Sequence, residues 1–68
     1  AAEPGQINLN TATVEQLAAL NGIGKAKAEA IIQYRNENGN FKSLDDLKSV
    51  KGIGTAILDK NRDLLALE

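Results

Sequence analysis

One stretch of the sequence occurs twice, as LAALNGIG at residues 17–24 and as LKSVKGIG at residues 47–54. Both copies read apolar-x-x-apolar-x-Gly-Ile-Gly, and they lie 30 positions apart. A hydroxyl residue, Thr13 or Ser43, precedes each copy and has an amide or carboxyl side chain three positions later. This spacing is typical of a capping box at the start of a helix. Each copy therefore predicts a short helix just before its Gly-Ile-Gly.

A longer helix is predicted after each Gly-Ile-Gly. In the first half, Ala28, Ile31 and Ile32 recur at helical spacing, and Gly39 suits the end of a helix. In the second half an amphipathic stripe runs through five positions: Ile57, Leu58, Asn61, Leu64 and Leu65. Asn61 is its one polar member and is interpreted as a hydrogen-bonded residue at the edge of the core. No segment alternates in the manner of a strand, so no strands are expected.

These patterns predict an all-α fold, a compact four-helix domain of two pseudo-equivalent hairpins. The hairpins span about residues 13–38 and 43–66. Phe41 is expected to anchor the connector between them in the core. The domain occupies residues 7–68, after a short flexible lead-in at residues 1–6.

Composition excludes several classes of function. The 68 residues suffice for one small domain, which has no cysteine and so must rely on its core alone. Without cysteine or histidine there is no zinc site of the usual kind and no Ser-His or Cys-His nucleophile. No stretch approaches the roughly 18 apolar residues of a membrane span, and no signal-peptide pattern opens the chain. Eight Lys/Arg against nine Asp/Glu give a net charge of −1, which argues against binding nucleic acid through bulk charge.

The Gly-Ile-Gly turns are candidate anion sites. The first glycine of each turn, Gly22 or Gly52, follows a short helix, where positive φ is usual. Each isoleucine points into the core, and the second glycine, Gly24 or Gly54, leaves the first amides of the next helix bare. Such amides carry the positive end of the helix dipole and bind phosphate. One Gly-x-Gly between helices is equally well explained as a tight turn, but two copies with the same flanking pattern favour phosphate binding.

Lysines gather at both turns. Lys25 and Lys27 follow the first turn, and Lys48 and Lys51 precede the second, so four of the eight basic side chains lie close to a Gly-Ile-Gly. Each lysine alone is most simply a solvated surface charge, whereas four around two turns support anion binding. Most of the acidic residues lie in the tails, at helix ends or along the long helices.

The pattern at residues 17–32 resembles the helix-hairpin-helix motif at every defined position. The sequence also resembles the tandem domain of the ComEA family of competence proteins in three further places: INLNTA at residues 7–12, Tyr34-Arg35 and Gly39-x-Phe41. The resemblance covers roughly residues 7–67. It implies a SAM-like fold with two hairpins related by a pseudo-two-fold axis. It further implies sequence-independent binding of double-stranded DNA, with backbone amides holding phosphates of both strands across the minor groove.

Carried over by position and joined by the flanking lysines, the DNA-binding residues implied by this resemblance are Gly22, Ile23, Gly24, Lys25, Ala26, Lys27, Lys48, Lys51, Gly52, Ile53, Gly54, Thr55 and Ala56. The resemblance also implies an extracytoplasmic, periplasmic DNA receptor that works with DNA-uptake machinery, as an exported form or an excised domain. The second hairpin departs from the motif, because Leu58 stands in place of Ala and Asn61 and Arg62 replace two apolar residues. Thr55 also stands where a side chain could have carried charge.

A helical protein-interaction module without DNA binding is the alternative function, and the net charge of −1 suits it. An enzyme is not expected, because the paired carboxylates Asp45 and Asp46 are adjacent and point in different directions. Neither a cofactor nor a metal site nor a small-molecule substrate is expected. Four other polar or aromatic residues are interpreted as structural: Tyr34 as a packing residue, Arg35 as a partner of the helix dipole or of an acid, and Asn8 and Asn10 in local turn hydrogen bonds.

Overall fold

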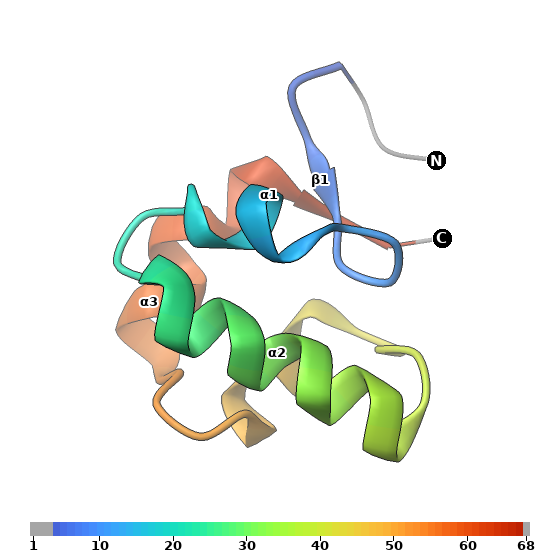
Figure 1. The fold of residues 1–68 in the computed structure, drawn as a ribbon. Helices are drawn as coiled ribbons and strands as arrows, with labels where there is room; N and C mark the ends of the chain where they lie inside the picture. The colour runs from blue at the N-terminus through green and yellow to red at the C-terminus, as the bar shows by residue number, and fades with distance from the viewer. Residues whose placement is uncertain (1–3, 68) are drawn as a thin grey trace.

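A computed structural model describes residues 4–67 of the protein. Its elements follow in the order β1 (Ile7–Asn8), α1 (Val14–Ala18), α2 (Gly24–Asn38), the 3-10 helix η1 (Leu44–Ser49), α3 (Thr55–Asn61), the 3-10 helix η2 (Arg62–Leu64) and β2 (Leu65–Ala66). The pair α1–α2 and the pair η1–α3 form the two hairpins (Figure 1). The all-α prediction is confirmed. Residues 1–3 of the predicted lead-in, and Glu68, lie outside the described residues.

Capping boxes begin the first helix of each hairpin, as predicted. In the first, Thr13 Oγ1 accepts from the backbone N–H of Gln16 at 3.2 Å, and the N–H of Thr13 donates to Gln16 Oε1 at 2.9 Å. In the second, the backbone N–H groups of Lys42 and Ser43 donate to Asp46 Oδ2 at 2.9 and 3.2 Å. These two donors, Lys42 first, lower the pKa of Asp46 because they stabilise its ionised form. The helix that follows in the second hairpin is a 3-10 helix, η1.

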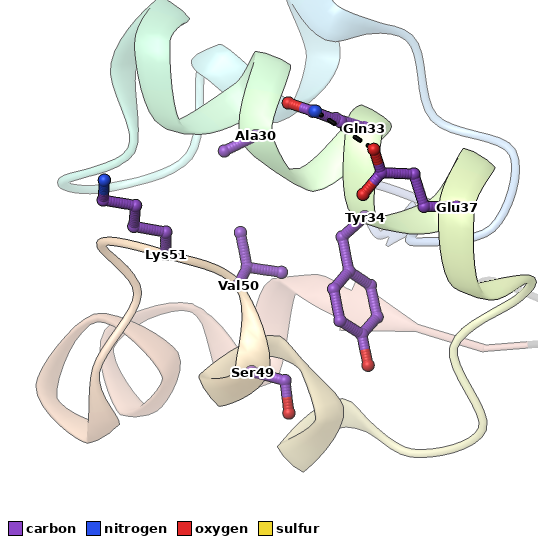
Figure 2. Close-up of a pocket in the computed structure, with 7 residues that line it drawn as sticks. All are labelled: Ala30, Gln33, Tyr34, Glu37, Ser49, Val50 and Lys51. Carbon is purple, nitrogen blue, oxygen red and sulfur yellow. Dashed lines mark hydrogen bonds between the residues drawn. The ribbon is translucent and has the colours of Figure 1, made fainter.

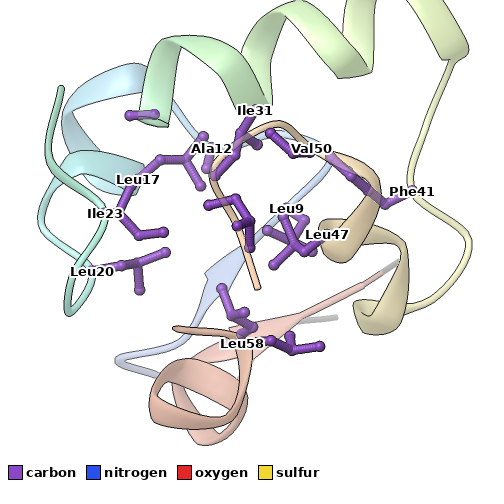
Figure 3. Packing of buried hydrophobic residues seen from close by; sticks show 13 residues of the cluster. Leu9, Ala12, Leu17, Leu20, Ile23, Ile31, Phe41, Leu47, Val50 and Leu58 are labelled. Atoms are coloured by element: carbon purple, nitrogen blue, oxygen red, sulfur yellow. The ribbon is translucent and has the colours of Figure 1, made fainter. Parts of the chain in front are cut away.

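Both hairpins contribute side chains at equivalent positions to one core. Five pairs of buried residues lie 30 positions apart: Leu17 and Leu47, Leu20 and Val50, Ile23 and Ile53, Ala28 and Leu58, and Ile31 and Asn61. Leu9, from the segment before α1, is fully buried in the same cluster (Figure 3). Equivalent positions of the repeat are therefore buried in both hairpins. This is expected where two hairpins pack about a pseudo-two-fold axis. Leu58, which departs from the motif, is fully buried.

The prediction that no strands form is wrong for four residues. Strands β1 and β2 pair in parallel, with Ile7 opposite Leu65 and Asn8 opposite Ala66. A strand of two residues is too short to show an alternating pattern, so sequence periodicity has no signal to offer. The pairing brings the first and last described segments of the domain side by side (Figure 1). Nε2 of Gln6 donates to the carbonyl of Asp63 at 3.2 Å and strengthens that closure.

The second long helix is shorter than its amphipathic stripe predicts. α3 ends at Asn61, which has φ −112° and ψ 0°, and the chain continues as η2 and β2. Nδ2 of Asn61 donates to the carbonyl of Ile57, four residues back, at 2.9 Å. A side chain that bonds a helix carbonyl competes with continuation of the helix, which accounts for the early end. As a result Leu64 is 39% exposed although the stripe places it on the apolar face.

The connector between the hairpins is fixed at Phe41. This ring is 3% exposed and stacks on Tyr34, with ring centroids 5.2 Å apart, which confirms Phe41 as the anchor and Tyr34 as a packing residue. Asn10 is more than the local turn residue predicted. Its amide exchanges two hydrogen bonds with the backbone of Phe41, at 2.6 and 3.1 Å. Asn8 does make the predicted local bond, since its Oδ1 accepts from the N–H of Asn10 at 2.8 Å.

Arg35 links α2 to the N-terminal segment. It lies in the last turn of α2, as the dipole interpretation expects. Its Nη1, however, donates to the carbonyls of Leu9 at 2.8 Å and Ala12 at 3.1 Å. The guanidinium thus binds backbone carbonyls rather than an acid, and it holds the segment before α1 against the helix.

Candidate functional site

The first Gly-Ile-Gly turn joins α1 to α2 and needs glycine at two positions. Gly22 has φ 76° and Gly24 has φ 67°, both in the left-handed region that side chains disfavour. Between them, Ile23 is 5% exposed and packs in the core, as predicted. Gly24 is itself the first residue of α2, so the turn leads directly into the helix.

A side chain of the second hairpin holds the first turn in place. Oδ1 of Asn61 accepts from the backbone N–H of Asn21 at 2.8 Å, and its Nδ2 donates to the carbonyl of Asn21 at 2.8 Å. Asn61 is only 1% exposed, so these bonds satisfy an amide that burial would otherwise penalise. The interpretation of Asn61 as a hydrogen-bonded residue is confirmed. No local pattern predicts that its partner is Asn21, the residue just before Gly22.

The second turn, between η1 and α3, has a different backbone. Gly52 has φ 90° and needs glycine, and Ile53 is 5% exposed. Gly54 instead has φ −112° and ψ −177°, extended backbone that any residue adopts, and it precedes α3 as the N-cap. A Cβ built on Gly54 meets no other atom within 4 Å. Neither backbone conformation nor packing therefore requires the glycine at position 54.

Each turn rests against a helix of the other hairpin. A Cβ built on Gly22 would lie 3.6 Å from Cγ1 of Ile57 in α3, and one built on Gly52 would lie 3.5 Å from Cε of Lys27 in α2. In the 30-residue repeat, Gly52 is equivalent to Gly22 and Ile57 is equivalent to Lys27. The two contacts are therefore reciprocal, as in an interface between two equivalent units. They bring both turns to the N-terminal end of α2 (Figure 1).

The helices that follow the two turns start without a side-chain cap. Neither the N-cap of α2, Ile23, nor that of α3, Gly54, makes a side-chain capping hydrogen bond. Thr13 and Ser43, by contrast, begin the other helix of each hairpin with capping boxes. The first amides of a helix have no partner within the helix, and they carry the positive end of its dipole. The turns therefore combine uncapped amides with positive electrostatic potential.

The predicted site residues differ in exposure. Most are exposed, namely Gly22, Gly24, Lys25, Ala26, Lys48, Lys51, Gly52, Gly54, Thr55 and Ala56. Lys27 is half-buried because its stem lies over Gly52. Ile23 and Ile53 are buried. Their backbone N–H groups are also occupied, because that of Ile23 donates to the carbonyl of Leu20 at 3.3 Å and that of Ile53 to the carbonyl of Val50 at 3.0 Å.

Four lysines supply positive charge at the turns, and an acid, Glu15, lies near one of them, Lys25. Within residues 4–67, none of the four lysines near the turns forms an ion pair, and the ion pairs found there belong to Arg62. Arg62 binds Asp59 at 3.0 Å and Asp45 at 3.3 Å, and these carboxylates, Asp59 first, raise the pKa of Arg62. Glu15 lies closer to the first turn than sequence reasoning anticipated. It lines a small groove of about 230 Å³ together with Lys25.

A second groove, of about 270 Å³, lies between α2 and the end of η1. Figure 2 shows Lys51 on one side of it and Gln33 and Glu37 of α2 on the other, with a hydrogen bond of 3.2 Å from Gln33 to Glu37. Tyr34 also lines this groove. The carboxylate of Glu37 makes this groove a poor match for phosphate, so it is separate from the anion sites proposed at the turns.

In residues 4–67, no three or more His, Cys, Asp or Glu side chains are grouped so that they could hold a metal ion. No helix in this range is long and apolar enough to cross a membrane.

The fold and the two turns define a class of protein, the small all-helical domain in which two helix–turn–helix pairs share one core. Comparison with known families identifies the family within this class. The family model described as the helix-hairpin-helix motif matches residues 3–66, and the chain belongs to that family.

Relatives of this chain occur in bacteria and in animals. An uncharacterized protein of Haemophilus influenzae is 52% identical over 59 residues, which make up 85% of this chain and 53% of that protein. ComE operon protein 1 of Bacillus subtilis is 44% identical over 62 residues, 91% of this chain and 30% of that protein. Endonuclease/exonuclease/phosphatase family domain-containing protein 1 of Homo sapiens is 40% identical over 57 residues, 84% of this chain and 10% of that protein. The chain thus spans about half the length, or less, of these curated relatives.

Proposed function

We propose that this domain binds double-stranded DNA without regard to sequence, by holding backbone phosphates at its two Gly-Ile-Gly turns. The observation that carries the proposal is the contrast in capping. The helices after the turns begin uncapped, in a chain that caps the first helix of each hairpin. Uncapped amides at the positive end of a helix are suited to phosphate. Membership in the helix-hairpin-helix family supports this assignment.

Each turn supplies backbone amides, and the lysines supply charge. In the first turn Gly22 and residues 24–26 provide the amides for the phosphates, and in the second turn Gly52 and residues 54–56 do so. The backbone N–H groups of Ile23 and Ile53 already donate to the carbonyls of Leu20 at 3.3 Å and Val50 at 3.0 Å, so these two residues shape the turns. Lys25, Lys27, Lys48 and Lys51 add positive charge beside the amides. Contacts to phosphates position the protein but carry no sequence information, so binding is independent of sequence. Each turn contacts a helix of the other hairpin, so the two turns lie at one end of the domain. The two phosphates are proposed to belong to opposite strands, facing each other across the minor groove.

The proposed cellular role is that of an extracytoplasmic DNA receptor in natural transformation, which passes DNA to uptake machinery. It is supported by the resemblance to the ComEA family and by the 44% identity to ComE operon protein 1. Binding without catalysis is proposed, since the human relative named after endonucleases, exonucleases and phosphatases shares only 10% of its length with this chain. Fractionation of the native host cells tests the location, and nicking assays with the purified protein test for catalysis.

A salt-titrated binding curve tests the DNA-binding proposal. Fluorescence anisotropy is measured with two labelled duplexes of unrelated sequence, at salt concentrations from low to physiological. If about four phosphate charges are neutralised, log K falls with log[salt] at a slope of about −3.6, and the two duplexes give the same curve. Binding that ignores salt, or that prefers one duplex strongly, contradicts the proposal. No binding at low salt, together with a stable oligomer in light scattering, supports the protein-interaction module instead.

A further inference from the structure

Lys27 lies over the turn of the opposite hairpin. It belongs to α2, which follows the first turn, yet its stem covers Gly52 of the second turn. A Cβ built on Gly52 would lie 3.5 Å from Cε, 3.7 Å from Cγ and 3.8 Å from Cδ of this lysine. The contact runs along the stem up to Cε, so the Lys27 ammonium, one bond beyond Cε, is carried to the second turn.

The equivalent contact at the first turn is apolar. Ile57, 30 residues after Lys27, covers Gly22 with its Cγ1 and Cδ1 atoms. The two hairpins therefore place a side chain at the same position over the opposite turn, but one is the apolar Ile57 and the other is the cationic Lys27. The cation that directly follows the first turn, Lys25, is likewise replaced in the second hairpin by Thr55. The second turn thus has the neutral Thr55 where the first turn has Lys25. It receives a positive charge from Lys27 of the other hairpin instead.

We propose that Lys27 is a phosphate ligand of the second turn rather than the first, so that one hairpin completes the DNA site of the other. The inference rests on the proposed function, because it assigns a residue to one of its two phosphate sites. Packing of the stem on Gly52 restricts the side chain before DNA arrives, which reduces the conformational entropy lost on binding. The ammonium forms no ion pair with any residue in 4–67 and is free to meet a phosphate. The two sites then differ, with Lys25 beside the first turn and Lys27 with Lys51 beside the second.

Replacing Lys27 with methionine tests the charge while keeping the stem. Lys27→Met should leave the melting temperature unchanged and should reduce the salt slope of duplex binding by about 0.9, the share of one phosphate contact. Lys27→Arg should restore the slope. Lys60→Met, at an exposed site in the last turn of α3, makes the same change in net charge and should leave the slope as it is.

A double-mutant cycle identifies the turn that Lys27 serves. Lys25→Glu and Thr55→Glu place a carboxylate at equivalent exposed positions of the first and second turns. Both lie in the first turn of a helix, where an acid is tolerated. Lys27→Met should weaken binding as much in the Lys25→Glu background as in the unaltered chain, and should have little further effect in the Thr55→Glu background. The reverse pattern, or full additivity in both backgrounds, overturns the inference. Absence of duplex binding by the unaltered protein would instead refute the proposed function itself.

Discussion

Replacing Gly54 with aspartate should make the domain more stable and, at the same time, a weaker DNA binder. Gly54 is the N-cap of α3 at φ −112° and ψ −177°, and a Cβ there meets no other atom within 4 Å. Aspartate at an N-cap accepts from the first amides of the helix, which is worth a few tenths of a kcal/mol over glycine. Its charge adds about 0.3–1 kcal/mol through the helix dipole. A gain of about 0.5–1 kcal/mol corresponds to a rise in melting temperature of about 2–8 °C for a domain of this size.

The effect on binding has the opposite sign. The new carboxylate occupies the position proposed for a phosphate and bonds the amides that would hold it. Two like charges about 4 Å apart repel by about 1 kcal/mol in water and about 4 kcal/mol at the effective dielectric constant of a protein surface. The affinity for duplex DNA should therefore fall by about fivefold or more. Gly54→Asn caps the same amides without a charge, so it should raise stability and weaken binding less than aspartate does.

Circular dichroism on heating gives the stability, and fluorescence anisotropy with a labelled duplex gives the affinity. Asn40→Asp is the matched control, because it makes the same change in net charge in the connector beyond the far end of α2. A helix of 15 residues is about 22 Å long, more than the Debye length of about 10 Å at 0.1 M salt, so this control should bind normally. If Gly54→Asp binds DNA as tightly as the unaltered protein, the second turn holds no phosphate and the reasoning is refuted. A fall in stability would contradict the capping geometry.

Three further predictions concern stability. Asn61→Ala removes the hydrogen bonds that tie the hairpins together, at roughly 1 kcal/mol each, and should lower the free energy of unfolding in urea by about 2–3 kcal/mol. Asn36→Ala on the exposed face of α2 should change it by no more than about 0.5 kcal/mol, and equal effects would exclude a special role for Asn61. Arg35→Ala removes two charge-assisted bonds to backbone carbonyls and should cost about 1.5–3 kcal/mol, measured by the same titration; no loss would show that they do not stabilise the fold. The stabilising effect of Asp46, whose pKa is lowered chiefly by the N–H of Lys42, is complete above its ordinary pKa of 3.8 and is lost as pH falls through the lower folded value. Asp46→Asn should therefore flatten the decline of melting temperature between neutral and acid pH, and an unchanged decline would contradict this.

The repeat made most of the fold predictable. Residues 30 positions apart share burial because the two hairpins build one core from the same pattern, so the fold class follows from spacing alone. The capping boxes at Thr13 and Ser43 were equally readable, since each depends only on residues within four positions. The positive φ of Gly22 and Gly52 follows from their place after a short helix.

Other features depend on contacts between distant segments and left no local signal. The bonds from Asn61 to Asn21 span 40 residues, and those from Arg35 to Leu9 span 26. Asn61 also shows how one polar residue overrides a pattern, because its side chain bonds the helix carbonyl and ends α3 early. At the candidate site, the sequence predicted the same role for the second glycine of both turns. In the structure only the first turn needs its second glycine, because Gly24 has positive φ and Gly54 has extended backbone. The identical Gly-Ile-Gly sequences cannot predict this difference in backbone conformation.

A net charge of −1 disfavours DNA binding through bulk charge, but the distance over which charges act decides which of them a bound phosphate meets. At physiological salt the Debye length is about 8 Å. Glu37 lies near the C-terminal end of α2, a helix about 22 Å long, whereas the first turn lies at its start, so this acid is screened from a phosphate held there. Arg62 binds Asp45 and Asp59 and thereby offsets the charge of two acids in the second hairpin. The lysines beside the turns act at contact distance, where screening is weakest. The positions of the charges near the turns therefore matter more for DNA binding than the net charge. The contact between the Lys27 stem and Gly52 brings to the second turn a positive charge from the first hairpin.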